Sequence, residues 1–144
     1  MITARAEIRV RYAETDAMGV AYHANYLAWF EVARTVMLEQ IGVPYKQLDT
    51  EGFLLPVLEM GARYLEPARY DDLLLITACL EEIPKVRIRL GYTVHNQGRL
   101  ITTGHTLHAF MSRAGLAIKP PLHVQQAFAR AFACHGTAGA DALR

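Results

Sequence analysis

The feature that most constrains the fold is a helix-forming segment, residues 24–41, that is apolar on nearly every side. Apolar residues recur in it at steps of three and four, the period of one helix face. They are Tyr26, Phe30, Ala33, Met37 and Ile41. Other apolar residues fill most of the remaining faces, and a helix of this kind is buried on most sides. The rest of the chain must therefore wrap around it.

The segments around this helix have the alternation or apolar runs of β-strands. One strand is expected before the helix, at residues 4–12, and four after it, at residues 53–65, 73–82, 86–95 and 100–113. The strand at 86–95 alternates most clearly, which predicts a sheet with one covered face and one wet face. A short turn or helix is expected at 45–52, and a weaker amphipathic helix at 121–134.

This order of elements predicts an α+β fold, in which a curled antiparallel β-sheet is wrapped around one long central helix. A chain of 144 residues fits one domain, expected over residues 1–134. The small, polar segment 135–144 is expected to be a flexible tail. A single sheet around one helix leaves an open sheet edge, which predicts a homo-oligomer.

Composition argues against several functional classes. Lys and Arg number 15 against 14 Asp and Glu, so there is no basic footprint for nucleic acid. Cys79 and Cys134 show neither a disulfide framework nor metal-ligand spacing, and we expect no metal and no cofactor. The first residues lack the apolar core of a signal peptide, and no apolar run approaches membrane-spanning length. A cytoplasmic protein is therefore expected.

The loop before the helix carries groups suited to acyl transfer. Asp16 precedes the helix start, where backbone N–H groups are free and the helix dipole is positive. Gly19 lets the backbone turn between Asp16 and the helix. A carboxylate beside such donors combines a base or nucleophile with donors for an oxyanion. The alternative is that Asp16 only caps the helix.

The stretch from Tyr12 to Tyr26 has the pattern Tyr-x-x-Thr-Asp-x-x-Gly-x-x-Tyr-His-x-x-Tyr, and Glu31-x-x-Arg34 follows in the helix. Together with the order of elements, this pattern resembles the hotdog-fold acyl-CoA thioesterases, in particular the 4-hydroxybenzoyl-CoA thioesterase family and its YbgC-like branch. The resemblance covers roughly residues 5–120, and it includes Pro67-x-x-Tyr70-Asp71-Asp72 and Gly104-His105-Thr106-x-His108.

The resemblance implies hydrolysis of an acyl-CoA to a carboxylic acid and free coenzyme A. Asp16 would be the general base for a water molecule or the nucleophile. The family's oxyanion donor, a backbone N–H seven residues after the Asp, falls on His23. Gly19 would keep the loop tight enough for the thioester to approach. The His23 ring would either pack locally or hold Asp16 or the attacking water.

Substrate contacts are expected from two pairs of residues. Tyr22 and Tyr26 are pocket or core aromatics, and Arg87 and Arg89 on one strand face are candidates for the coenzyme A phosphates, with solvated charges as the alternative. In the family the groove generally lies between subunits of a dimer or homotetramer, so phosphate contacts could come from a neighbouring chain. Glu14 is expected to be solvated.

Two rival functions belong to other classes. The first is an enoyl-thioester hydratase or dehydratase on the same fold, in which Asp16 and His23 would imitate a proton-moving pair. The Tyr-x-x-Thr-Asp-x-x-Gly loop matches the thioesterase branch instead. The second is a non-catalytic acyl-thioester-binding protein, which no feature of the sequence supports.

In the helix, Glu31 and Arg34 are expected to form an ion pair.

Overall fold

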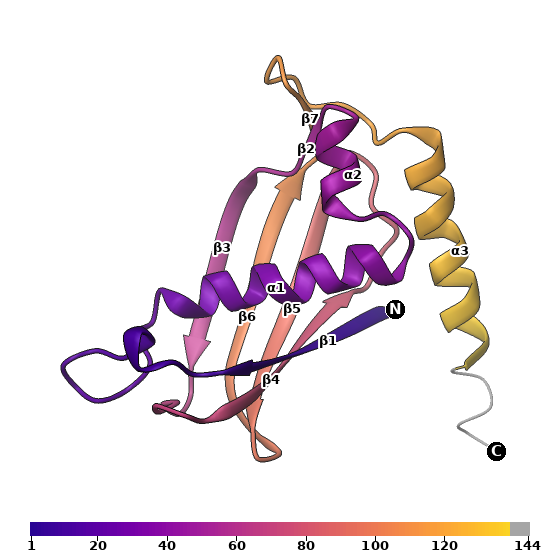
Figure 1. The fold of residues 1–144 in the computed structure, drawn as a ribbon. Coiled ribbons are helices and arrows are strands. Elements are labelled where there is room, and N and C mark those ends of the chain that lie inside the picture. Colours follow the sequence, from indigo (N-terminus) through magenta and orange to yellow (C-terminus); the bar gives the residue numbers. More distant parts are fainter. Residues whose placement is uncertain (139–144) are drawn as a thin grey trace.

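One long helix, α1 (Asn25–Gln40), lies across the face of a curled antiparallel sheet in the computed structural model, which describes residues 1–138 (Figure 1). The sheet has the strand order β1-β4-β5-β6-β3. Its strands are β1 (Ile2–Arg9), β3 (Val57–Tyr64), β4 (Leu73–Leu80), β5 (Arg87–Asn96) and β6 (Arg99–Ala109). Every neighbouring pair is antiparallel. The predicted α+β hotdog fold is confirmed.

Two predicted strands are each divided into two pieces. A separate pair is formed by β2 (Phe53–Leu54) and β7 (Met111–Ser112), with Phe53 opposite Ser112. Pro56 lies between β2 and β3, where its missing N–H cannot contribute to a strand ladder. The short helix α2 (Tyr45–Thr50) precedes β2, at the position expected for a turn or helix.

The C-terminal helix α3 (Leu122–Ala138) is longer than expected, because it continues past the predicted boundary at 134. It packs on β1 and buries Val124, Ala127 and Phe128. The remainder of the predicted tail, 139–144, lies outside the described residues. Among residues 1–138, no helix has the length and apolar character needed to cross a membrane.

The first strand also differs from its prediction, since it ends at Arg9 and not at residue 12. Val10 is buried, and its N–H donates to the Asp72 carbonyl, just beyond the last ladder pair of β1 and β4. Tyr12 then lies in a 3₁₀ turn, η1 (Tyr12–Glu14), and its side chain is 77% exposed. Its ring meets Tyr70 edge-on with centroids 5.7 Å apart. Tyr12 therefore does not share the buried face of Val10.

The core forms where α1 meets the sheet. Phe30 of α1 is fully buried and stacks on Tyr92 of β5, with ring centroids 4.5 Å apart and planes 10° from parallel. Gly104 of β6 faces the same ring, and a Cβ at this position would lie 2.5 Å from Phe30 Cε2. The absence of a side chain at Gly104 therefore allows α1 to approach the sheet closely.

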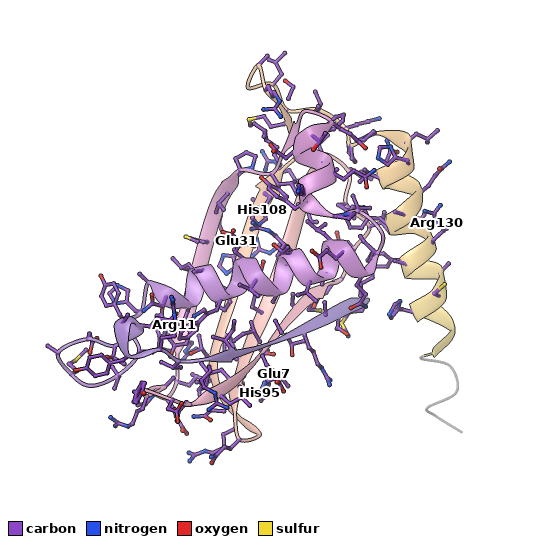
Figure 2. All side chains as sticks on the ribbon, viewed as in Figure 1. Glu7, Arg11, Glu31, His95, His108 and Arg130 are labelled. Atoms are coloured by element: carbon purple, nitrogen blue, oxygen red, sulfur yellow. The ribbon has the colours of Figure 1, made fainter. Side chains whose placement is uncertain are left out.

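Arg34 does not form the expected ion pair with Glu31. Within residues 1–138, Glu31 takes part in no ion pair. The Nη1 of Arg34 instead donates to Nε2 of His108, 3.0 Å away. Figure 2 labels Glu31 and His108, which lies on β6. Because an arginine N–H can only donate, the His108 proton lies on Nδ1, 3.3 Å from the Leu55 carbonyl. Burial, and then the charge of Arg34, lower the pKa of His108 to about 4. His108 is thus a neutral core residue.

Replacing Gly104 by Ala is expected to destabilise the protein by about 1–3 kcal/mol, since the new methyl group overlaps the Phe30 ring. The matched control is Gly91→Ala in the neighbouring strand, where a Cβ has nothing within 4 Å and φ is not positive. Its unfolding free energy should change by less than about 1 kcal/mol. Urea titration of both variants checks this, and equal midpoints would contradict the packing argument.

Stability is expected to fall as the pH is lowered from about 6.5 toward 4, because unfolded His108 takes up a proton that folded His108 does not. The full loss is on the order of 3 kcal/mol. Urea unfolding at pH 6.5 and 5 measures the slope, which His108→Gln should flatten. The control His95→Gln should keep the wild-type slope, and an unchanged slope in His108→Gln would refute the assignment.

Candidate active site

The loop between η1 and α1 is a tight hairpin-like turn. Thr15 and Ala21 form an isolated antiparallel bridge, and inside it the Asp16 N–H donates to the Val20 carbonyl at 2.9 Å. The Gly19 N–H returns to the Asp16 carbonyl at 2.9 Å, and Gly19 has a φ of 75°. This left-handed conformation is one that glycine adopts without strain. The turn thus fixes the backbone on both sides of Asp16.

The Asp16 carboxylate is half-buried, and one of its oxygens remains available. Oδ1 accepts the Met18 N–H at 2.9 Å, a local turn bond. Within residues 1–138, Oδ2 accepts no hydrogen bond. The N-cap position of α1 is Ala24, and no side chain caps it, so Asp16 is not a helix cap here. Its remaining lone pairs are free for chemistry.

His23 presents an unused backbone donor close to the start of α1. Over the described part of the chain, its N–H donates to no backbone or side-chain acceptor. Its carbonyl accepts the Tyr64 hydroxyl at 2.7 Å, which fixes this residue from the neighbouring strand β3. The His23 ring lies against Tyr22 with centroids 4.4 Å apart. A free N–H near a helix start is the kind of group that stabilises an oxyanion.

Asp16 and His23 line the same cavity, which has a volume of about 300 Å³. Tyr26 also lines it, whereas Tyr22 and Gly19 do not. The other lining residues are Met18, Val20, Ala21, Tyr64, Leu65, Glu66 and Pro67. Of these, Tyr64 is a site residue that the sequence analysis missed. Its position at the end of a strand, just before the Pro67 motif, was the available signal.

Tyr26 forms the buried wall of this cavity. It is only 2% exposed, and burial raises the pKa of its hydroxyl. Its ring meets Tyr64 edge-on at 5.0 Å and Trp29 at 4.6 Å. Tyr26 is therefore a neutral core aromatic that gives the cavity a rigid apolar side.

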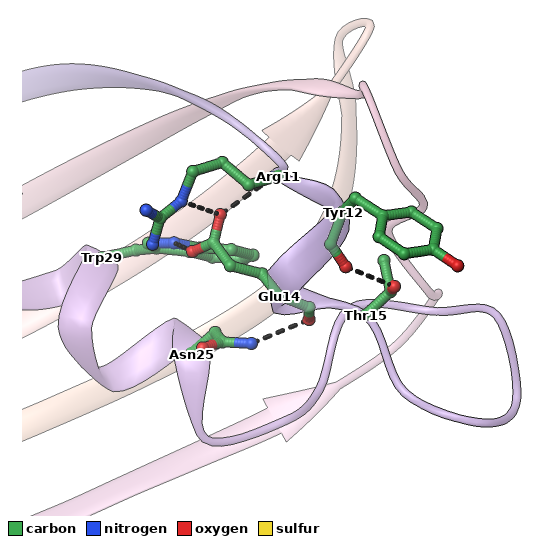
Figure 3. A network of polar contacts seen from close by, with 6 residues as sticks. All are labelled: Arg11, Tyr12, Glu14, Thr15, Asn25 and Trp29. Atoms are coloured by element: carbon green, nitrogen blue, oxygen red, sulfur yellow. Dashed lines mark hydrogen bonds and ion pairs between the residues drawn. The ribbon is translucent and has the colours of Figure 1, made fainter.

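Glu14 is buried, and the expectation that it would be solvated is wrong. Only 7% of it is exposed, and its carboxylate accepts three N–H groups: Arg11 N at 2.9 Å, Arg11 Nε at 3.1 Å and Trp29 Nε1 at 2.8 Å (Figure 3). Burial acts to raise its pKa, but these hydrogen bonds and the Arg11 charge outweigh burial and lower the pKa. The buried carboxylate is therefore ionised and fully bonded.

Arg87 and Arg89 lie on the outer face of β5, away from α1. They line a different cavity of about 350 Å³, together with Glu81, Glu82 and others, and not the cavity of Asp16. Arg89 is 4.0 Å from the carboxylate of Glu59 on β3. Within one chain, the structure does not bring these arginines to Asp16.

No set of three or more His, Cys, Asp or Glu side chains in residues 1–138 is grouped to hold a metal ion. The arrangement around Asp16 therefore consists of a carboxylate, a free backbone donor and an apolar cavity. These are the groups needed to attack a polarised carbonyl carbon and to stabilise the oxyanion that forms.

Comparison with known proteins gives consistent results. Residues 10–131 match the model of the Thioesterase-like superfamily. The chain is 33% identical to YneP of Bacillus subtilis over 129 residues, 89% of this chain and 91% of that protein. It is 44% identical over 103 residues to the acyl-CoA thioester hydrolase YbgC of Escherichia coli, 72% of each chain. The crystal structure of the DHNA-CoA thioesterase of Staphylococcus aureus has a TM-score of 0.82 and 30% identity, covering 94% of this chain and 96% of that one.

Proposed function

Because the chain belongs to the Thioesterase-like superfamily and is a thioester hydrolase, we propose that it hydrolyses an acyl-CoA to a carboxylic acid and free coenzyme A. The observation that carries this proposal is the presence of the Asp16 carboxylate and the His23 residue, with its unused N–H, on one 300 Å³ cavity. The relative YbgC, which is named an acyl-CoA thioester hydrolase, supports coenzyme A as the carrier.

In the proposed reaction, the thioester carbonyl oxygen faces the His23 N–H and the acyl group lies against Tyr26. As general base, Asp16 takes a proton from water while the water oxygen bonds to the carbonyl carbon. The carbonyl oxygen becomes an oxyanion, and a preorganised donor at this position contributes about 2.7–4 kcal/mol. The C–S bond then breaks, and the thiolate of coenzyme A receives the proton.

The same geometry allows Asp16 to act as a nucleophile. Its free Oδ2 would then bond to the carbonyl carbon, the C–S bond would break, and water would hydrolyse the mixed anhydride. A thiolate is a modest base, so neither route needs a strong acid at the leaving group. A single turnover in water enriched in oxygen-18 separates the routes, since only the nucleophilic one can place the label in Asp16.

The hydratase alternative would use the imidazole of His23 together with Asp16. No hydrogen bond joins these two side chains within residues 1–138, and the His23 ring packs instead against Tyr22 and Tyr64. The geometry therefore supports a role for the His23 backbone more than for its ring. Formation of a hydroxyacyl-CoA from an enoyl-CoA, without thiol release, would favour the hydratase.

We propose further that the active protein is a homodimer or homotetramer, formed through strand β3. β3 is an edge of the sheet, and its open side adjoins exposed apolar residues. They are Val57, Leu58, Met60 and Leu65, which are 41–47% exposed. Two-fold antiparallel pairing would set the start of one β3 beside the end of the other. Arg89 reaches β3, since it lies 4.0 Å from Glu59, and we therefore propose Arg87 and Arg89 of the second copy as phosphate contacts across the interface.

Asp16→Asn is expected to lower kcat by about 100-fold or more, since an amide can neither accept the proton nor attack as a carboxylate. Thiol release from a panel of acyl-CoAs, followed with a thiol reagent, gives the rate. His23→Ala keeps the backbone N–H and should lose no more than about tenfold. Undiminished turnover by Asp16→Asn would remove Asp16 from the mechanism, and an equally large loss in His23→Ala would assign chemistry to its ring.

Met60→Glu is expected to yield monomers with weakened hydrolysis, because a charge on the open β3 edge opposes pairing with a second copy. Light scattering coupled to size exclusion measures the mass. Leu122→Glu is the matched control. Leu122 is 67% exposed on α3, and α3 packs on β1, the edge strand opposite β3. A wild-type protein that is already monomeric, or an unchanged mass for Met60→Glu, would contradict the proposed interface.

A further inference from the structure

Glu14 is the only acidic side chain that is buried in residues 1–138. Both of its carboxylate oxygens are used: Oε1 accepts two N–H groups of Arg11, and Oε2 accepts the indole N–H of Trp29. Arg11 follows strand β1, and Trp29 lies one turn into α1. The carboxylate therefore joins the end of the first strand segment to the core helix (Figure 3).

The main chain of Glu14 makes a second connection. Its carbonyl accepts the Tyr22 N–H at 2.8 Å and the Asn25 Nδ2 at 2.8 Å. The side chain of Asn25 is consequently used to hold Glu14 and does not cap α1. Glu14 thus contacts both Tyr22, which immediately precedes His23, and the first turns of α1, which follow His23.

Within residues 1–138, no other hydrogen bond joins the limb of the loop that carries Asp16 to α1. Most of the remaining bonds join loop residues to one another, such as Asp16 N–H to the Val20 carbonyl. The second limb of the loop is held separately, since the Ala21 N–H donates to the Ala68 carbonyl at 2.8 Å. The first limb, which carries Asp16, is tied to α1 through Glu14. The spacing between the Asp16 carboxylate and the His23 N–H therefore depends on Glu14 as well as on the Thr15–Ala21 bridge.

We propose that Glu14 is a positioning residue of the hydrolase, which holds Asp16 at the correct place relative to the His23 N–H without touching substrate. This inference rests on the proposed role of Asp16. Hydrogen bonds to a charged group are stronger than neutral ones, so three of them on a buried carboxylate fix the loop firmly. Reaction rates are sensitive to such placement, because a shift of about 1 Å can cost about 100-fold.

The test uses Glu14→Gln in the full chain. Glutamine keeps the size of the side chain and can still accept the Trp29 N–H, but its amide group then meets the Arg11 donors. We expect kcat to fall by about 10- to 100-fold while KM changes by less than about threefold. The control Glu7→Gln, at an exposed carboxylate on β1, should retain wild-type kcat. If Glu14→Gln does not fold, Trp29→Phe removes the indole bond to Glu14 instead, and it should also lower kcat.

A double-variant comparison separates positioning from general damage. If Glu14 acts through Asp16, adding Glu14→Gln to Asp16→Asn will lower the residual rate no further. Trp29 is the only tryptophan of the chain, so a shift in its fluorescence in Glu14→Gln, with unchanged far-ultraviolet circular dichroism, reports a changed environment at the Glu14–Trp29 contact in a folded protein. The proposal is overturned by wild-type kcat in Glu14→Gln, by a raised KM alone, or by equal losses in both backgrounds.

Failure of the positioning role is distinct from failure of the proposed mechanism. An inactive Asp16→Asn beside a fully active Glu14→Gln rejects the role of Glu14 only. A fully active Asp16→Asn rejects Asp16 as the chemical group, and with it the positioning of that group by Glu14.

Discussion

The packing of α1 against the curled sheet is the constraint on which the rest of the structure depends. Phe30 can reach its stack with Tyr92 only because Gly104 has no side chain. Once this contact sets the depth of the helix, the loop before it must turn sharply, and the wall residue Tyr26 is carried into the core. The position of the site at the start of α1 is thus a consequence of how the helix is buried.

Much of this arrangement could be predicted from the sequence. The apolar α1 and the alternating strand β5 have strong periodic signals, and the turn at Gly19 follows from local backbone chemistry. The parts that could not be predicted depend on partners distant in sequence. Arg34 bonds to His108, which is 74 positions away, in preference to a neighbour on its own helix. The burial of Glu14 likewise depends on where Trp29 points, and the alternation of strand residues carries no information on this.

Two buried ionisable groups show how the fold treats charge in opposite ways. Within residues 1–138, His108 has no anionic partner, so burial and the nearby charge of Arg34 both favour its neutral form. Glu14 has three donors and a guanidinium, which compensate the cost of burying its charge. The middle of α1 therefore holds a neutral imidazole beside a cationic guanidinium, whereas the loop holds a buried carboxylate. Arg87 and Arg89 lie outside both regions, on the solvent face of β5.

The pairing of β1 with β4 has a consequence for synthesis of the chain. Ile2 lies opposite Leu80, so β1 leaves the ribosome without its partner until the chain beyond β4 has been made. The apolar helix α1 emerges before every strand of the sheet except β1, and β6, which carries Gly104, comes last. The apolar helix α1 therefore stays without its sheet during much of translation, and the core can close only after Ala109 has emerged.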